Sequence, residues 1–137
     1  MDNIEYIKHN EQILAIIIKH KFSKKGIEFF TPDEFSQQLG YMSHPAGKII
    51  EPHFHNPVER NVVYTQEVLY IKRGKIKVNF YDEQKHFLYD RVLESGDVIL
   101  LANGGHGFEV LEEIEMIEIK QGPYQGDSDK TRFNPLS

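Results

Sequence analysis

The stretch EPHFHNPVERNVVYTQEVLYIKRG, residues 51–74, holds two histidines one residue apart, then a glutamate, then a glycine that ends an apolar run. Residues two apart on a β-strand project from one face, so His53 and His55 would point the same way, with their Cα atoms about 6.5 to 7 Å apart. Both rings could then reach one metal ion with bonds of about 2.1 Å. Taken alone, such a pair is also common on exposed strands.

Two further polar residues lie in register with apolar residues. Counting back from Gly74, Glu67 shares one strand face with large aliphatic side chains. If that face is the core, Glu67 is a buried acid, which is costly unless it is paired or bound to a cation. Near the C-terminus, His106 likewise shares a face with Phe108. The pattern therefore indicates that Glu67 and His106 lie inside an otherwise apolar core.

The rest of the chain favours an all-β fold, because short runs rich in Ile, Val, Tyr and Phe recur between turn residues without a βαβ rhythm. Residues 13–22 and 27–30 predict a hairpin around the turn 23–26. Thr31 and Pro32 predict a short helical turn. Further strands are expected at 38–44, 49–55, 62–72, 75–81, 86–93, 98–101, 106–111 and 114–120.

The composition is that of one folded domain of 137 residues, with 39% hydrophobic and 27% charged residues. We expect strands and a helical turn at 1–37, the main β-structure at 38–121 and an irregular tail at 122–137. The absence of cysteine leaves histidine and carboxylate as metal ligands. A net charge of −5 with scattered lysines argues against a nucleic-acid partner. The short apolar runs predict no membrane partner and a cytoplasmic location.

Two groups of residues resemble the two sequence motifs of the cupin family. They are Gly47, His53, Phe54, His55, Glu67 and Gly74, and then Gly96, Asp97, Asn103, Gly104 and His106. The resemblance covers residues 40–120. It implies a double-stranded β-helix, or jelly-roll, barrel, here with an N-terminal β-hairpin extension. It also implies that four residues bind one divalent metal ion inside the barrel, namely His53, His55, Glu67 and His106.

The carboxylate ligand has an alternative in Glu59. Eleven residues separate His55 from Glu67, a longer separation than is usual in the family, whereas Glu59 lies at the usual spacing. The residue seven positions after Glu59 is Gln66, but the residue seven positions after Glu67 is the motif glycine, Gly74. We therefore prefer Glu67 and keep Glu59 open.

Three imidazoles and one carboxylate suit Fe, Mn, Ni, Zn or Cu as the divalent ion. An ion held by four protein ligands keeps positions open for a small molecule, alone or beside dioxygen or water. We therefore expect a metal-dependent enzyme acting on a small organic molecule, by oxygenase-type or by isomerase- or epimerase-type chemistry. The alternative is a cupin that binds a small molecule or a metal without turnover, as a sensor or accessory protein, with carbohydrate metabolism as one setting.

Residues near the predicted ligands are candidates for contact with the small molecule. These candidates are Arg60, Asn61, Tyr64, Thr65, Phe108 and Gln121. The interior should be mainly apolar, because alternation predicts that ten residues point inward: Val63, Leu69, Ile76, Val78, Phe80, Val98, Leu100, Phe108, Ile117 and Ile119.

The predicted N-terminal hairpin is unusually apolar, with Ile13, Ile16, Ile17 and Ile18. Exposed strands of this kind tend to be covered. We expect this hairpin to pack on, or exchange into, the sheet of a second copy, so that the protein is a homodimer. The alternative is that it closes one side of its own barrel.

Overall fold

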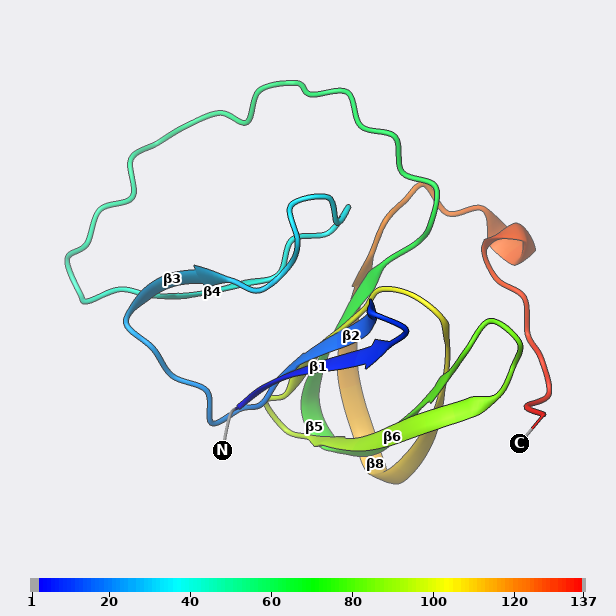
Figure 1. Ribbon diagram of the computed structural model, residues 1–137. Helices are drawn as coiled ribbons and strands as arrows, with labels where there is room; N and C mark the ends of the chain where they lie inside the picture. Colours follow the sequence, from blue (N-terminus) through cyan, green and yellow to red (C-terminus); the bar gives the residue numbers. More distant parts are fainter. Residues whose placement is uncertain (1–2, 137) are drawn as a thin grey trace. The chain divides into compact units, whose positions relative to one another are not determined.

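The computed structural model describes residues 3–136; Met1, Asp2 and Ser137, where the predicted terminal segments end, lie outside this part. The described chain is all-β, as predicted, and Figure 1 shows its course. No helix in this part is long and apolar enough to cross a membrane. Its elements are β1 Ile4–His9, β2 Gln12–Ile18, β3 Gly26–Phe29, β4 Gly40–Ser43, β5 Glu67–Tyr81, β6 Phe87–Glu94, β7 Val98–Leu101, β8 Gly105–Lys120 and the 3-10 helix η1 Gly126–Asp129.

The chain divides into two compact units. The hairpin unit is Ser23–Tyr64, and the sheet unit consists of the residues up to Phe22 together with those from Thr65 onward. Their positions relative to one another are not determined. In the hairpin unit β3 pairs antiparallel with β4, and the long segment that follows β4 contains no strand.

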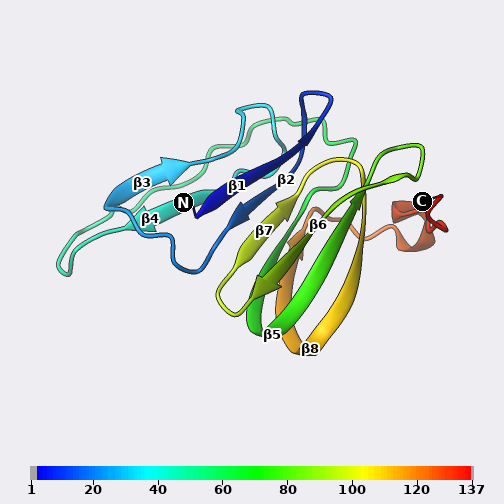
Figure 2. The ribbon, with the colours of Figure 1, turned by 60° about the horizontal axis from the view of Figure 1, so that its bottom comes forward.

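The sheet unit contains a curled antiparallel sheet in the order β1-β2-β7-β5-β6, with β8 on the opposite edge of β5. Figure 2 shows the curl. The first part of β5 pairs with β7 from Glu67 to Tyr70, and the second part pairs with β6 from Lys75 to Tyr81. The pairing with β8 runs along almost the whole of β5. These long ladders make β5 the central strand of the unit.

The core lies on the concave face of this sheet. Each large aliphatic side chain that it removes from water contributes about 1.5 to 3 kcal/mol. The predicted inward positions Leu69, Ile76, Val78 and Phe80 are buried there, as expected. The buried residues of this core are Ile7, Leu14, Ala15, Ile17, Leu69, Ile71, Ile76, Val78, Phe80, Leu93, Ile99 and Leu101.

A glycine allows β5 to continue where the sequence predicted a turn. Gly74 has φ 102°, and a Cβ there would lie 2.1 Å from the backbone oxygen of Glu113 on β8. The pairing is bulged between Ile71 and Ile76. Because of this irregularity the buried side chains of β5 are odd-numbered up to Ile71 and even-numbered from Ile76 onward. One bent strand therefore replaces the two strands predicted at 62–72 and 75–81.

The predicted hairpin of 13–22 with 27–30 is wrong. β2 pairs with β1 and β7, whereas β3 pairs with β4. Asn10 and Glu11 have φ 50° and 64°, so they form a tight two-residue connection that folds β1 back on β2. Because β2 lies between β1 and β7 of the same sheet, Ala15, Ile16 and Ile17 are buried within their own chain. This is the alternative in which the apolar strand covers one side of its own fold. A homodimer stays a prediction.

The segment between β4 and β5 also differs from expectation. Residues 44–66 contain no strand, so the strand predicted at 49–55 is wrong and the one predicted from 62 begins only at Glu67. Pro45, Pro52 and Pro57 lack backbone donors and restrict the residues before them, which disfavours a continuous ladder here. The predicted helical turn is a single turn, in which the Phe35 N–H donates to the Pro32 carbonyl oxygen at 3.1 Å.

The last strand is longer than predicted, and this changes which residues point inward. The strands expected at 106–111 and 114–120 form one strand, β8, without a turn. Although the pairing with β5 shifts register in the middle of β8, Glu118 and Lys120 share the face of Leu69 and Glu67. Ile117 and Ile119, which were predicted to point inward, lie on the opposite face and are exposed.

Three other inward predictions also fail. On β7, residues 99 and 101 pair with Leu69 and Glu67 and share their face, so Val98 and Leu100 face the other way. Leu100 is buried all the same, and a strand that is apolar on both faces gives no alternation from which to choose. Val63 is 74% exposed in the hairpin unit.

A buried carboxylate ties the β6–β7 turn to the end of β2. Asp97 is fully buried, and it accepts hydrogen bonds from the backbone N–H groups of His20 and Glu94, both at 2.8 Å. Lys19 Nζ donates to Asp97 Oδ2 at 2.9 Å. Burial raises the pKa of Asp97, but these hydrogen bonds outweigh burial and hold it below its ordinary value of 3.8. The folded state therefore favours the ionised form.

We predict that Asp97→Asn lowers the free energy of unfolding at pH 7 by about 2 to 4 kcal/mol, since a buried, hydrogen-bonded charge is lost beside Lys19. The contribution of Asp97 is complete above its ordinary pKa and is lost as pH falls through the lower pKa of the folded state. The difference between wild type and variant should shrink below about pH 4. Urea unfolding from pH 7 to pH 2.5 measures it, with the exposed Asp90→Asn as control; a pH-independent difference would contradict the assignment.

We also predict that Gly74→Ala destabilises the protein by about 3 kcal/mol or more, because the positive φ and the approach of β8 leave no room for a Cβ. The matched control is Gly107→Ala on β8, whose added Cβ would have its nearest neighbour at 3.8 Å. Urea unfolding of both variants makes the comparison. Equal stability of the two would show that the bulge at Gly74 relaxes without cost.

Candidate functional site

Two of the four predicted metal ligands meet in the sheet unit. Glu67 lies at the start of β5 and pairs with Lys120, whereas His106 lies at the start of β8 and pairs with Phe80. The two residues thus belong to opposite ends of one ladder, yet Glu67 Oε1 and His106 Nε2 are 3.0 Å apart. Only a ladder that bends back on itself brings its ends together in this way. The curl of the sheet therefore builds the site.

The contact is a polar interaction in a partly buried setting. In the tautomer that carries its proton on Nε2, His106 donates a hydrogen bond to Glu67. This hydrogen bond lowers the pKa of Glu67; burial opposes it, and His106, Glu118 and Lys120 lower it further. Glu67 is thus held as a carboxylate, the form that accepts hydrogen bonds or binds a cation.

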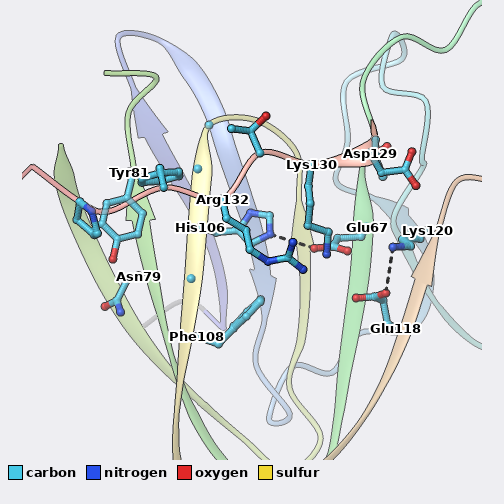
Figure 3. A pocket seen from close by; sticks show the side chains of 17 residues that line it. Glu67, Asn79, Tyr81, His106, Phe108, Glu118, Lys120, Asp129, Lys130 and Arg132 are labelled. Carbon is cyan, nitrogen blue, oxygen red and sulfur yellow. Dashed lines mark hydrogen bonds and ion pairs between the residues drawn. The ribbon is translucent and has the colours of Figure 1, made fainter. Parts of the chain in front are cut away.

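A pocket of about 720 Å³ opens beside this pair, and Figure 3 shows the side chains that line it. Its walls come from three parts of the sheet unit: both ends of β5, the β8 strand and the C-terminal segment. Asn79 and Tyr81 on β5 add polar groups, and Phe108 stacks at an angle on His106 with ring centroids 5.6 Å apart. The pocket therefore combines a carboxylate–imidazole pair with both polar and aromatic walls.

Glu118 and Lys120 also line the pocket, and sequence reasoning missed both. Lys120 Nζ lies 3.7 Å from Glu118 Oε1, and both side chains share the inner face with Glu67. The signal was present in the sequence: continuing the alternation of His106 and Phe108 along an unbroken strand leads to even-numbered residues. The break predicted between the strands 106–111 and 114–120 concealed it.

The C-terminal segment forms the remaining wall, with residues 129–133 and Pro135. The Phe133 ring packs edge-on against Tyr81, with centroids 5.4 Å apart and planes at 90°. The Leu136 N–H donates to the Lys85 carbonyl oxygen at 3.0 Å. A Cβ on Gly105 would lie 2.9 Å from the Phe133 ring, so a glycine gives the segment room to dock.

The other two predicted ligands lie in the hairpin unit. The rings of His53 and His55 are adjacent, with centroids 5.2 Å apart, although no strand holds them. His53 Nδ1 lies 2.8 Å from the Glu51 carbonyl oxygen, to which it donates in the tautomer protonated on Nδ1. That bond leaves His53 Nε2 free as a ligand atom, the arrangement in which metal-binding histidines are usually oriented. Glu59, the alternative carboxylate, belongs to the same unit and is exposed.

The predicted contact residues are distributed over three places. Thr65 and Phe108 line the pocket beside Glu67, whereas Arg60 and Asn61 line a separate hollow within the hairpin unit. Tyr64 is largely exposed. Gln121 has a structural contact, because its Oε1 accepts a hydrogen bond from the Gln66 N–H at 2.6 Å where β5 begins and β8 ends.

The chemistry of the donor set is compatible with a divalent ion. Two ligand atoms that each lie about 2.1 Å from one ion, at about a right angle, are about 3.0 Å apart. The separation between Glu67 and His106 has this value, and it is also that of an ordinary hydrogen bond. Within residues 3–136, no group of three or more potential ligand side chains is assembled around one point. Glu67 and His106 are therefore a pair of donors that would need further ligands.

Comparisons of the chain with protein-family models, with curated proteins and with solved structures find no match.

Proposed function

We propose that the protein is a divalent-metal-dependent enzyme of the cupin type that acts on a small organic molecule. The ligands in this proposal are His53, His55, Glu67 and His106. One observation carries it: a histidine and a glutamate chosen from motif spacing, 39 positions apart in the chain, lie 3.0 Å apart beside a pocket. The jelly-roll barrel belongs to the same proposal, and the curled antiparallel sheet is compatible with part of such a barrel.

The adjacent rings of His53 and His55 support the second half of the ligand set. Their two imidazoles lie on a segment without strand pairing, and His53 keeps one ring nitrogen free. The proposal requires this segment to bring both rings to Glu67 and His106. The result would be three imidazoles and one carboxylate, a set that Fe, Mn, Ni, Zn and Cu all accept.

The residues around the pair have separate roles in the proposed reaction. Glu67 is held ionised by His106, so it can bind a cation without first losing a proton. Glu118 and Lys120 line the same pocket and can accept and donate protons to a bound molecule. A bound divalent ion would supply Lewis-acid polarisation of an oxygen or, as iron, chemistry with dioxygen.

The alternative is a binding protein that uses the same pocket without turnover. The exposed position of both hairpin-unit histidines favours it, since a catalytic site usually excludes water from its ligands. In this case the small molecule would occupy the pocket and leave unchanged.

We predict that protein purified without chelator contains about one divalent ion per chain. His106→Ala and His53→Ala should each reduce this to below about 0.2, because a site with fewer ligands loses affinity steeply. Glu67→Gln should do the same while Glu59→Gln retains the metal. Plasma mass spectrometry of the purified variants measures the content.

The matched control is His9→Ala, which removes a histidine on β1, far from both motifs in sequence. Wild-type protein with less than about 0.2 ion per chain, together with no effect of His53→Ala, would refute the metal site. Loss in Glu59→Gln but not in Glu67→Gln would move the carboxylate ligand to Glu59.

For the reaction, we predict that the Fe(II)-loaded protein consumes dioxygen with one class in a panel of catechols, thiols, diketones and keto acids. An oxygen electrode measures the uptake, which should be absent in His106→Ala and normal in His9→Ala. If a compound shifts the melting temperature but is recovered unchanged under air, with Fe(II) and with other metals, the binding-protein alternative is correct instead.

A further inference from the structure

The pocket contains two cations that no carboxylate neutralises. Lys130 and Arg132 line it from the C-terminal segment, and both are exposed. Neither forms an ion pair with any residue from 3 to 136. Figure 3 shows both side chains directed toward the contact between Glu67 and His106. In a chain of net charge −5, two adjacent unpaired cations at one pocket are a distinct electrostatic feature.

The acidic residues of the pocket are already engaged with other partners. Glu67 contacts His106, and Glu118 contacts Lys120. Asp129 accepts a hydrogen bond from the Gln125 N–H at 3.0 Å, at the start of η1. The positive charge of Lys130 and Arg132 is therefore available to a ligand.

The segment that carries these cations is held against the sheet unit by two residues that follow them in the chain. Phe133 packs against Tyr81, one position beyond Arg132, and Leu136 is hydrogen-bonded to Lys85. These contacts hold the backbone of residues 130–132 over the pocket, although the two side chains are solvated. A guanidinium in such a position can bind a carboxylate or phosphate through two parallel hydrogen bonds, and an ammonium adds a point charge.

We propose that Lys130 and Arg132 bind the anionic group, a carboxylate or a phosphate, of the small molecule that this pocket takes up. The other end of that molecule then reaches Glu67 and His106. This inference rests on the proposed function for the reaction, but the anion site itself consists of residues of this chain and does not require a metal. Thr131 between the two cations and Tyr81 opposite them offer hydroxyl groups to the same ligand.

The test is calorimetric titration of the full chain, treated with chelator, using inorganic phosphate and malonate as probes of the two anionic groups. We expect at least one probe to bind, with an affinity that falls as salt rises. The double variant Lys130→Gln, Arg132→Gln should bind it about tenfold more weakly. The exchange Lys130→Arg, Arg132→Lys keeps both charges and should restore most of the affinity.

The matched control is Lys21→Gln, Lys25→Gln, which removes two exposed lysines outside the pocket and should leave binding unchanged. The inference is overturned if neither probe binds the chelator-treated protein, or if the double variant binds as wild type does. Binding that appears only after metal loading, and that the double variant retains, places the anion on the metal: it supports the proposed function and refutes this inference. An unchanged metal content in the double variant, together with weakened anion binding, supports both the proposed function and this inference.

Discussion

The structure of the sheet unit depends on one constraint: the β5–β8 ladder must bend without breaking. Gly74 makes the bend possible, because it has a positive φ and no Cβ to meet β8. With the bend, the residues at the two ends of the ladder face one another, and the Glu67 carboxylate meets the His106 imidazole. A straight ladder would hold these two groups about 40 Å apart. The site is therefore a consequence of the curvature of the sheet.

The buried Asp97 supports the same geometry from the other side of β5. Its backbone N–H and carbonyl groups take part in a turn that also bonds to Ile71, where the Ile71 N–H donates to the Asp97 oxygen at 2.9 Å. Its side chain fixes Lys19 and His20 at the end of β2. The carboxylate of the second motif is thus structural, and it holds the strand before the bend in place. Among the polar residues of the two motifs, Asp97 stabilises the fold, whereas Glu67 and His106 form the candidate site.

Much of this could be predicted from the sequence, and the failures have identifiable causes. The strands β6 and β7 lie close to the predicted ranges 86–93 and 98–101, and the burial of Leu69, Ile76 and Val78 follows from simple alternation. The wrong hairpin arose because a two-residue turn at Asn10 and Glu11 carries no glycine, although its backbone needs positive φ. Breaks were predicted between the strands 62–72 and 75–81 and between the strands 106–111 and 114–120, but continuous strands pass through both, since bulges absorb the irregularity within the ladder.

The residues of the pocket likewise include some that the sequence predicted and some that it did not. Motif spacing selected Glu67 and His106, which the structure brings together, and nearness to these predicted ligands selected Thr65 and Phe108, which line the same pocket. It did not reveal Glu118 and Lys120, because the wrong turn reversed the alternation, nor Lys130 and Arg132, because a segment without periodicity gives no indication of where it docks. Motif spacing also selected His53 and His55, but their segment lacks the predicted strand, because prolines interrupt it.

The most direct test of the central claim is the X-ray absorption spectrum of the metal-loaded protein at the edge of the bound metal. The account predicts a first shell with three imidazole nitrogens and a carboxylate oxygen at about 2.1 Å, and with multiple-scattering features of imidazole. A shell of oxygen atoms without imidazole would contradict the claim that the bent ladder builds a metal site.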